Sequence, residues 1–183
     1  MAWIWNGIPS TARNTKRRSG KKIGPNPTDR AKGGVKRRRQ TEAQGIPIGR
    51  VPDGANRHDM KLVERTLQSQ PPAVEAARAA WAAAGAEQHL CLDAGDDDDQ
   101  VRETVTAHGY PTHIRGRGEE KKAKQAGQRA RRWGHPGRVV ERTHSWLNRY
   151  RHLLIRWAKK PDNYLAMLHF ACACLPWKCC LFG

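Results

Sequence analysis

The sequence predicts an α/β fold in which helices flank a mixed sheet. Three observations support this. Short runs of apolar, aromatic and β-branched residues alternate with longer stretches of helical periodicity. Turn-forming Gly and Pro residues separate these runs. The length of 183 residues suits one hydrophobic core, so we expect residues 1–183 to form a single domain.

Five segments have the composition of strands, which favours aromatic and branched residues on a pleated surface. The expected strands are residues 3–8, 35–41, 46–51, 89–92 and 112–114. The second and third would form a hairpin around a turn that ends at Gly45. Both are unusual strands, because residues 37–39 and Arg50 place charge where an inner strand favours apolar residues, and Pro52 limits pairing.

Five further segments have the pattern of helices, with capping residues before them and Gly or Pro after them. The expected helices are residues 59–70 capped by Asp59, 73–84, a helix that begins within 96–99 and closes at Gly109, 139–160 and 163–175. The helix 139–160 carries an inward stripe that includes Thr143, Trp146 and Trp157. The helix 163–175 is apolar almost all round, which predicts burial. Basic, Gly-containing segments at 9–34 and 115–138 are expected to form a loop and a connector.

The expected elements follow the order strand, hairpin, helices, strand, helix, short strand, long helix and final helix. That is the order of a ribonuclease-H-like domain, in which helices flank a mixed sheet. Order alone is a weak criterion, because many α+β folds satisfy it.

The charge of the chain is high and unevenly placed. The formal net charge is +17. Residues 1–50 carry net +11, residues 51–114 carry net −6 and residues 115–160 carry net +12. Basic flanks of this kind favour a polyanionic partner, and nucleic acid releases counterions when its phosphates are neutralised. The acidic middle is typical of a nuclease-like site, where carboxylates hold metal beside a basic track.

Other classes of protein fit the sequence less well. The longest apolar run, residues 164–175, is interrupted by His169 and is shorter than the ~20 residues that a spanning helix needs. We therefore expect no membrane segment, and we see no signal peptide. Five cysteines without a secretion signal favour reduced thiols in the cytoplasm. The cysteines near His169 lack zinc-site spacing, and burial as small apolar residues is the better interpretation.

Two acids stand where metal-dependent phosphodiester chemistry could use them. Asp93 ends a buried strand, and a carboxylate there needs a partner, a metal or water. Glu141 opens the helix 139–160, on the side opposite the apolar stripe. From pattern alone, Asp93 could equally be a solvated strand end or a helix cap, and Glu141 is better explained as a solvated residue near a helix start.

Seven segments together resemble the DDE-type transposases of bacterial insertion sequences, in the group related to the fifth-numbered element. They are residues 24–30 (GPNPTDR), 45–49 (GIPIG), 54–59 (GANRHD), 90–95 (LCLDAG), 113–115 (HIR) with 118–121 (GEEK), 139–149 (VVERTHSWLNR) and 163–168 (NYLAML). Each segment is weak evidence by itself. The ordered set covers nearly the whole chain and is highly specific.

The resemblance implies a ribonuclease-H-like core, two Mg²⁺ ions, with Mn²⁺ as a substitute, and three acids. Asp93 matches the second acid and Glu141 the third, so both are expected to be catalytic metal ligands. The resemblance also implies cleavage and strand transfer on double-stranded DNA at insertion-sequence ends. It further implies a homo-oligomer when active and a cytoplasmic, nucleoid-associated location in a bacterium.

Basic residues are expected to hold DNA phosphates in this interpretation. They are Arg17, Arg18, Lys21, Lys22, Arg30, Arg142, Arg149 and Arg151.

The chain departs from the family pattern at several points. Asn6 stands where the first acid is expected, so we expect Asn6 to be a defective third member of the catalytic set. The N-terminal helix-turn-helix region of the family is expected to be missing. The run 96–99 contains four aspartates in place of a tyrosine pattern, and residues 134–138 separate Trp133 from Val139. These departures predict a truncated, degenerate copy with impaired activity; the alternatives are a non-catalytic basic DNA-binding remnant and a chain that does not fold stably.

Overall fold

The computed structural model describes residues 5–8, 15–16, 21–27, 29–92, 94–114 and 136–182. The expected connector 115–138 lies outside the described residues up to residue 135. Its last three residues begin a helix. Within the expected loop 9–34, two short strands are described, β2 (Thr15–Lys16) and β3 (Gly24–Pro25).

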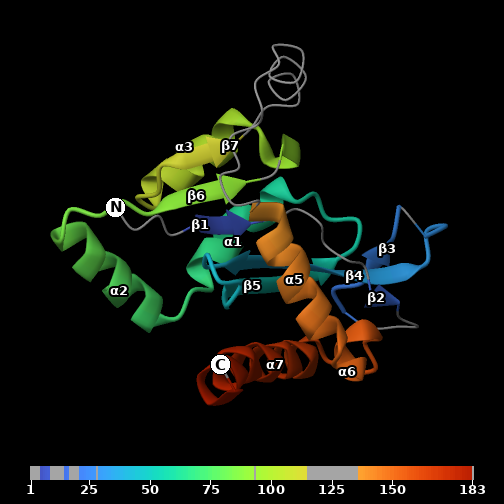
Figure 1. Ribbon diagram of the computed structural model, residues 1–183. Helices are drawn as coiled ribbons and strands as arrows, with labels where there is room; N and C mark the ends of the chain where they lie inside the picture. Colours follow the sequence, from blue (N-terminus) through green and yellow to red (C-terminus); the bar gives the residue numbers. More distant parts are fainter. Residues whose placement is uncertain are drawn as a thin grey trace, which may run out of the picture.

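A mixed sheet forms the centre of the molecule, and all five strands expected from the sequence lie in it (Figure 1). They are β1 (Trp5–Ile8), β4 (Gly33–Thr41), β5 (Pro47–Gly54), β6 (His89–Leu92) and β7 (Thr112–Ile114). The hairpin of β4 and β5 forms despite its charged residues. Pro52 is accommodated because β5 pairs only with β4 in the described part of the chain.

The strand β1 lies between the antiparallel and the parallel halves of the sheet. It pairs with β4 in the antiparallel sense, with Gly7 opposite Thr41. It pairs with β6 in the parallel sense, from Trp5 opposite His89 to Ile8 opposite Leu92. The strand β7 continues the parallel half beside β6. The main strands therefore follow the order β5, β4, β1, β6 and β7.

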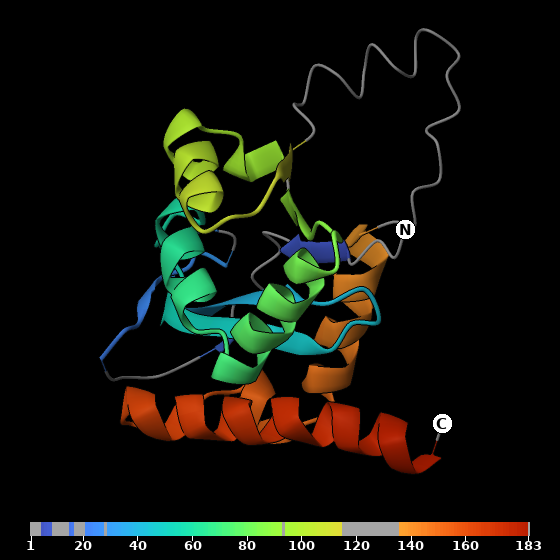
Figure 2. The same ribbon diagram turned by 90° about the vertical axis from the view of Figure 1, so that its left-hand side faces the viewer.

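Helices pack on both faces of this sheet (Figure 2). They are η1 (Met60–Leu62), α1 (Val63–Gln68), α2 (Pro72–Ala83), η2 (Ala94–Asp96), α3 (Asp99–Ala107), α5 (Pro136–Asn148), α6 (Arg151–Leu154) and α7 (Pro161–Phe182). The helices α1 and α3 contact each other on one face, and α5 crosses β1 and β4 on the other. The helix α7 contacts β5, α5 and α6.

Two hydrophobic clusters lie on the two faces of the sheet. One joins α1 and α3 to β6 and β7 through Leu67, Leu90 and Val105. The other joins α5, α6 and α7 to β4 through Val35, Leu147 and Leu168. Burial of these apolar side chains supplies most of the stability of the fold.

The prediction of one long helix over residues 139–160 was wrong. The helix α5 ends at Asn148, a turn follows, and α6 covers only Arg151–Leu154. The change of direction brings Leu153 into the second cluster, where the carbonyl of Leu153 accepts a hydrogen bond from Tyr164 Oη at 3.3 Å. The predicted stripe ends with this break, because Trp157 is 71% exposed.

The predictions of a buried last helix and of a cap at Asp59 were also wrong, whereas the predicted start of a helix within residues 96–99 is confirmed by α3. The helix α7 buries one face only and leaves Phe170 63% exposed, because it lies on the outside of α5 and α6. Asp59 makes no capping hydrogen bond and instead binds Lys36. Asp98 caps α3 by accepting a hydrogen bond from Gln100 N, whereas Asp96 is fully buried.

Candidate functional site

Of the predicted site residues, Asn6 lies in β1, and Asp93 directly follows the neighbouring strand β6 in the sequence. Asn6 lies in β1 opposite Leu90 of β6. Asp93 lies outside the described residues, directly between Leu92, the last residue of β6, and Ala94, the first of η2. Because β1 and β6 are parallel, their carboxyl ends meet at one edge of the sheet. The register therefore brings the end of β1 and the end of β6, the last described residue before Asp93, to the same edge.

The third predicted residue, Glu141, lies on α5, which contacts β1 and β4. Val140 and Leu147 of this helix are completely buried against the sheet. Glu141 is exposed on the flank that it shares with Ser145. An exposed carboxylate on a helix that packs against β1 is available to a ligand, and it is also compatible with simple solvation.

The turn between β4 and β5 fixes the first half of α5. Thr143 Oγ1 donates a hydrogen bond to Gly45 O, and Arg142 Nη2 donates one to Gln44 O at 2.8 Å. Gly45 has a φ of 93°, and a Cβ there would lie 3.0 Å from Thr143 Oγ1. Glycine thus permits both the turn and the close approach of the helix that carries Glu141.

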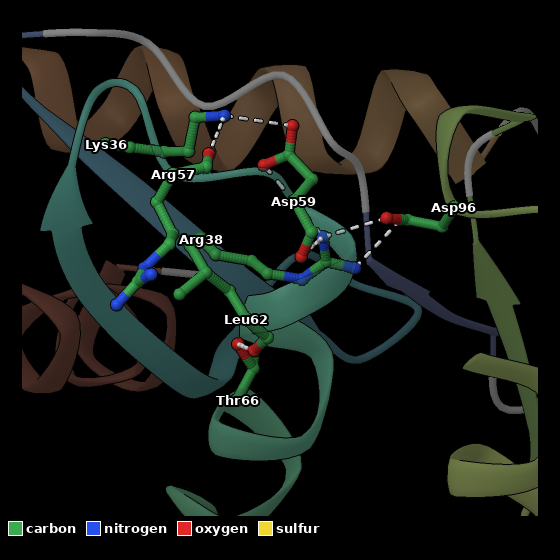
Figure 3. A network of polar contacts seen from close by, with 7 residues as sticks. All are labelled: Lys36, Arg38, Arg57, Asp59, Leu62, Thr66 and Asp96. Carbon is green, nitrogen blue, oxygen red and sulfur yellow. Dashed lines mark hydrogen bonds and ion pairs between the residues drawn. The ribbon is translucent and has the colours of Figure 1, made fainter. Parts of the chain in front are cut away.

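A polar network on the other face of β4 reaches the segment that follows residue 93 (Figure 3). Arg38 donates two hydrogen bonds to the Asp96 carboxylate, at 3.1 and 2.8 Å. Arg38 Nη1 also donates to Asp59 O at 2.9 Å, and Lys36 Nζ donates to Asp59 Oδ2 at 3.1 Å. The network ties β4 to the end of η2, three residues beyond Asp93.

The sequence analysis missed this network. It treated Asp59 as a helix cap and residues 96–99 as the start of a helix. Two signals could have found it: the excess of arginine in an inner strand, and the excess of aspartate after β6. Buried charges of opposite sign need each other as partners, so the two anomalies explain one another.

Strand alternation sends Arg37 and Arg39 to the opposite face, under α5 and α7. Arg37 Nη2 donates to Asn148 Oδ1 at 3.1 Å, and Arg39 Nη2 contacts the His144 ring. Both guanidinium groups are almost fully buried. Burial, followed by repulsion from Arg37, lowers the pKa of Arg39 to about 9.

The predicted DNA-binding residues are described in part. Arg17 and Arg18 lie outside the described residues. The other six, Lys21, Lys22, Arg30, Arg142, Arg149 and Arg151, are all exposed. Arg142 also stacks over the Trp146 ring, 5.3 Å from its centroid, so it stabilises α5 in addition to any contact with a phosphate.

No group of three His, Cys, Asp or Glu residues that could hold a metal occurs among the residues whose placement is described. Two of the three predicted ligands are not described at the level of the side chain. Cys172 is buried, and burial raises the pKa of its thiol despite Arg50, Arg39 and Arg37 nearby. Cys172 lies in the second hydrophobic cluster, in agreement with the interpretation of this cysteine as a small apolar residue.

Comparison with known proteins decides the family. Residues 90–175 match the family model described as "Transposase DDE domain". The chain is also 32% identical over 163 residues to a protein of Burkholderia cepacia assigned as the transposase of insertion sequence element IS402, over 85% of this chain and 69% of that protein. The chain belongs to the DDE transposases of insertion sequences. No solved structure matches it.

Membership of this family means that the transposase acts in DNA transposition and binds DNA. The family generally uses divalent metal ions as cofactors. The matched segment 90–175 contains both Asp93 and Glu141. The mixed α/β architecture agrees with a DDE domain. Among the described helices, none is long and apolar enough to cross a membrane.

Proposed function

We propose that this transposase cleaves and joins DNA strands at insertion-sequence ends, with residues 1–183 acting as one ribonuclease-H-like catalytic domain. Asp93 and Glu141 are the proposed catalytic carboxylates and metal ligands, and Asn6 is a defective third member. Water attacks the phosphodiester at the end of the element, and the bond from phosphorus to the 3′ oxygen breaks. The freed 3′-hydroxyl then attacks a phosphodiester of the target DNA. A new bond from its oxygen to phosphorus forms, the bond from that phosphorus to the 3′ oxygen of the target strand breaks, and the target strand is left with a free 3′-hydroxyl.

The parallel pairing of β1 with β6 is the observation that carries this proposal. The strand order β5, β4, β1, β6 and β7, antiparallel up to β1 and parallel beyond it, supports the proposed ribonuclease-H-like architecture. In this order, Asn6 lies on the central strand and Asp93 follows the adjacent one. The helix that carries Glu141 packs against the same central strand.

The proposed ligands are of the type that Mg²⁺ favours, but together they carry too little negative charge. Two carboxylates and one amide oxygen are the hard ligands that Mg²⁺ favours. Asn6 contributes no negative charge, so the set carries two charges where the family pattern implies three. Bound divalent ions would polarise the phosphodiester and lower the pKa of the attacking water. The fit predicts weak metal binding by the chain as it stands.

The chain's own residues hold and orient the substrate in this proposal. The exposed basic residues Lys21, Lys22 and Arg30 lie in one stretch and would contact phosphates. Thr143 and Arg142 anchor α5 on the β4–β5 turn and thereby hold Glu141 in place. Homo-oligomerisation and association with the nucleoid are parts of this proposal that follow from the family alone.

The test compares the natural chain with the variant Asn6→Asp. We expect the variant to bind Mn²⁺ at least tenfold more tightly in isothermal titration calorimetry and to nick DNA that contains the element's ends. In the Asn6→Asp background, Glu141→Gln should abolish both gains. Glu103→Gln, which neutralises an exposed glutamate on α3, is the matched control and should abolish neither. A folded Asn6→Asp protein that gains neither metal binding nor nicking contradicts the catalytic assignment.

A non-catalytic DNA-binding remnant is the second candidate function. The presence of Asn6 in place of an acid favours it, as does the net charge of +17. It predicts salt-sensitive DNA binding that neither Asp93→Ala nor added metal changes.

A further inference from the structure

A basic pocket opens beside the end of β5. Its volume is about 430 Å³, and four of its lining residues are basic: Lys22, Arg57, His58 and Lys61. Only Lys22 belongs to the DNA-binding set expected from the sequence. Lys22 and Lys61 are exposed and form no ion pair with any residue that the structure describes. We call this site the basic pocket.

Asp53 is the one acid among the residues that line the basic pocket, and it is already engaged. Arg65 Nη1, from α1, forms an ion pair with Asp53 Oδ2, and Gly54 N donates to Asp53 Oδ1 at 2.8 Å. Burial by itself raises the pKa of Asp53, but these hydrogen bonds and the arginine charges bring it below its usual value. The carboxylate is therefore ionised and faces two arginines, Arg65 and, at 4.0 Å, Arg57 Nε. One negative charge is thus shared by two guanidinium groups, and the two lysines add further positive charge.

The floor of the basic pocket is built from close backbone packing. A Cβ on Gly54 would lie 2.8 Å from Asn56 Oδ1, and a Cβ on Gly24 would overlap the same atom. Arg57 N donates to Gly54 O at 3.0 Å. Only glycine allows strand β3 and the end of β5 to approach Asn56 this closely. The two lining segments are thus held in a fixed arrangement.

The network of Figure 3 connects the basic pocket to the edge that carries the proposed catalytic residues. Lys36 Nζ donates to Arg57 O at 2.8 Å and also binds Asp59. Asp59 in turn accepts from Arg38, which binds Asp96 beyond β6. The Arg57 side chain is 52% exposed, and in Figure 3 its guanidinium points away from Lys36 and Asp59. Its backbone is thus fixed, while its charged end is accessible.

We propose that the basic pocket binds one phosphate of the DNA backbone next to the catalytic edge, through Arg57, Lys61 and Lys22. This inference rests on the proposed function, which makes DNA the substrate. A guanidinium and ammonium groups around an open polar pocket suit a phosphate oxygen. Phosphate contacts position a duplex without reading its sequence, so the pocket would set where the DNA lies relative to Asp93 and Glu141.

The test measures duplex DNA binding by fluorescence anisotropy across a range of salt concentrations. We compare the natural chain with Arg57→Gln/Lys61→Gln. Releasing one phosphate should make the slope of log K against log salt less negative by about 0.9. The factor by which affinity falls between 50 and 200 mM salt should therefore be about 3.5-fold smaller for the variant than for the natural chain. The effect should be equal on element ends and on random duplexes.

Arg102→Gln/Lys160→Gln is the matched control, because it also removes two positive charges, from residues that do not line the basic pocket. It should leave the slope unchanged. Equal shifts in the pocket variant and in this control overturn the proposal, since net charge alone would then explain them. An unchanged slope in a folded pocket variant also overturns it and leaves the proposed function intact. A natural chain that binds inorganic phosphate but no duplex contradicts both.

Discussion

Arg38 and Asp96 form a bidentate ion pair in which both side chains are completely buried, with hydrogen bonds of 3.1 and 2.8 Å. The pair joins an inner strand of the sheet to the short helix η2. Asp96 therefore ends the segment that begins immediately after the proposed catalytic Asp93. In this chain, the aspartate run after β6 and the arginine run in β4 stabilise each other.

Removal of one partner from this pair should strongly destabilise the folded chain. Asp96→Ala leaves the Arg38 guanidinium buried without its main counter-charge, so we expect the free energy of unfolding to fall by about 3–5 kcal/mol in urea denaturation. Asp97→Ala is the matched control. Asp97 binds Arg102 at 2.6 Å on the surface, where the loss should be about 0–1 kcal/mol. Equal losses in the two variants would show that the buried pair has no special role.

Arg39 should lower the stability of the folded chain. It is almost fully buried, and its Nε and Nη1 atoms have no hydrogen-bond partner in the described part of the chain. Arg39→Leu should raise the free energy of unfolding by about 1–4 kcal/mol, because an apolar side chain suits this position under α7. Arg149→Leu, at an exposed position, should change it by less than about 0.5 kcal/mol. A loss of stability in Arg39→Leu would contradict this account.

The same arginine predicts a dependence on alkaline pH. The pKa of Arg39 is about 9 in the folded chain, below the ordinary value of 12.5. Above pH 9 the unfolded chain therefore binds more protons at this residue, so its contribution to stability rises with pH. The advantage of Arg39→Leu over the natural chain should narrow between about pH 8.5 and 10.5 in denaturant titrations. A constant difference across that window would show that Arg39 stays protonated.

His113 predicts a second, acidic dependence. Burial and the neighbouring His89, whose Nδ1 lies 2.9 Å from His113 Nε2, lower the pKa of His113 below 6.5. The unfolded chain therefore binds more protons just below pH 6.5, and stability should fall as the pH drops through that value. His113→Gln should flatten this part of the stability profile. The same substitution at the exposed His152 serves as the control.

Alanine substitutions at Gly45 and Gly85 should distinguish the cost of backbone strain from the cost of steric contact. Both have positive φ, 93° and 74°. A Cβ on Gly45 would press on Thr143 and Val139 of α5, whereas one on Gly85 would meet no atom within 4 Å. Gly85→Ala should cost about 1 kcal/mol from strain alone. Gly45→Ala should cost more and should also increase amide exchange in the first turns of α5. The reverse order of the two losses would contradict the proposed anchoring of α5.

The sequence predicted the strands well because their signals are local. Alternation and bounding turns located β4, β5, β6 and β7 within a few residues. The break after Asn148 could not be predicted in the same way. Helical periodicity continues through residues 149–150, and the turn depends on where Leu153 must lie to reach the second hydrophobic cluster. Tertiary contacts override local periodicity there.

The candidate site, too, could be predicted from the sequence only in part. Asp93 and Glu141 were selected by resemblance, and their roles are still predictions. The position of Asn6 beside β6 follows from the parallel register, which no local pattern specifies. The Arg38–Asp96 pair joins residues 58 positions apart. The arginines of β4 and the aspartates after β6 are each unusual in the sequence, but no local pattern indicates that they contact each other.

The parallel pairing of β1 with β6 has a consequence for synthesis of the chain. Trp5 leaves the ribosome early, yet its partner is His89. The hairpin of β4 and β5 can close as soon as Gly54 emerges, but the middle of the sheet must wait for β6. During that interval β1 can pair with β4, but the side of β1 that later meets β6 has no partner strand. Nascent chains that stop before residue 92 should therefore be prone to aggregate through this open edge.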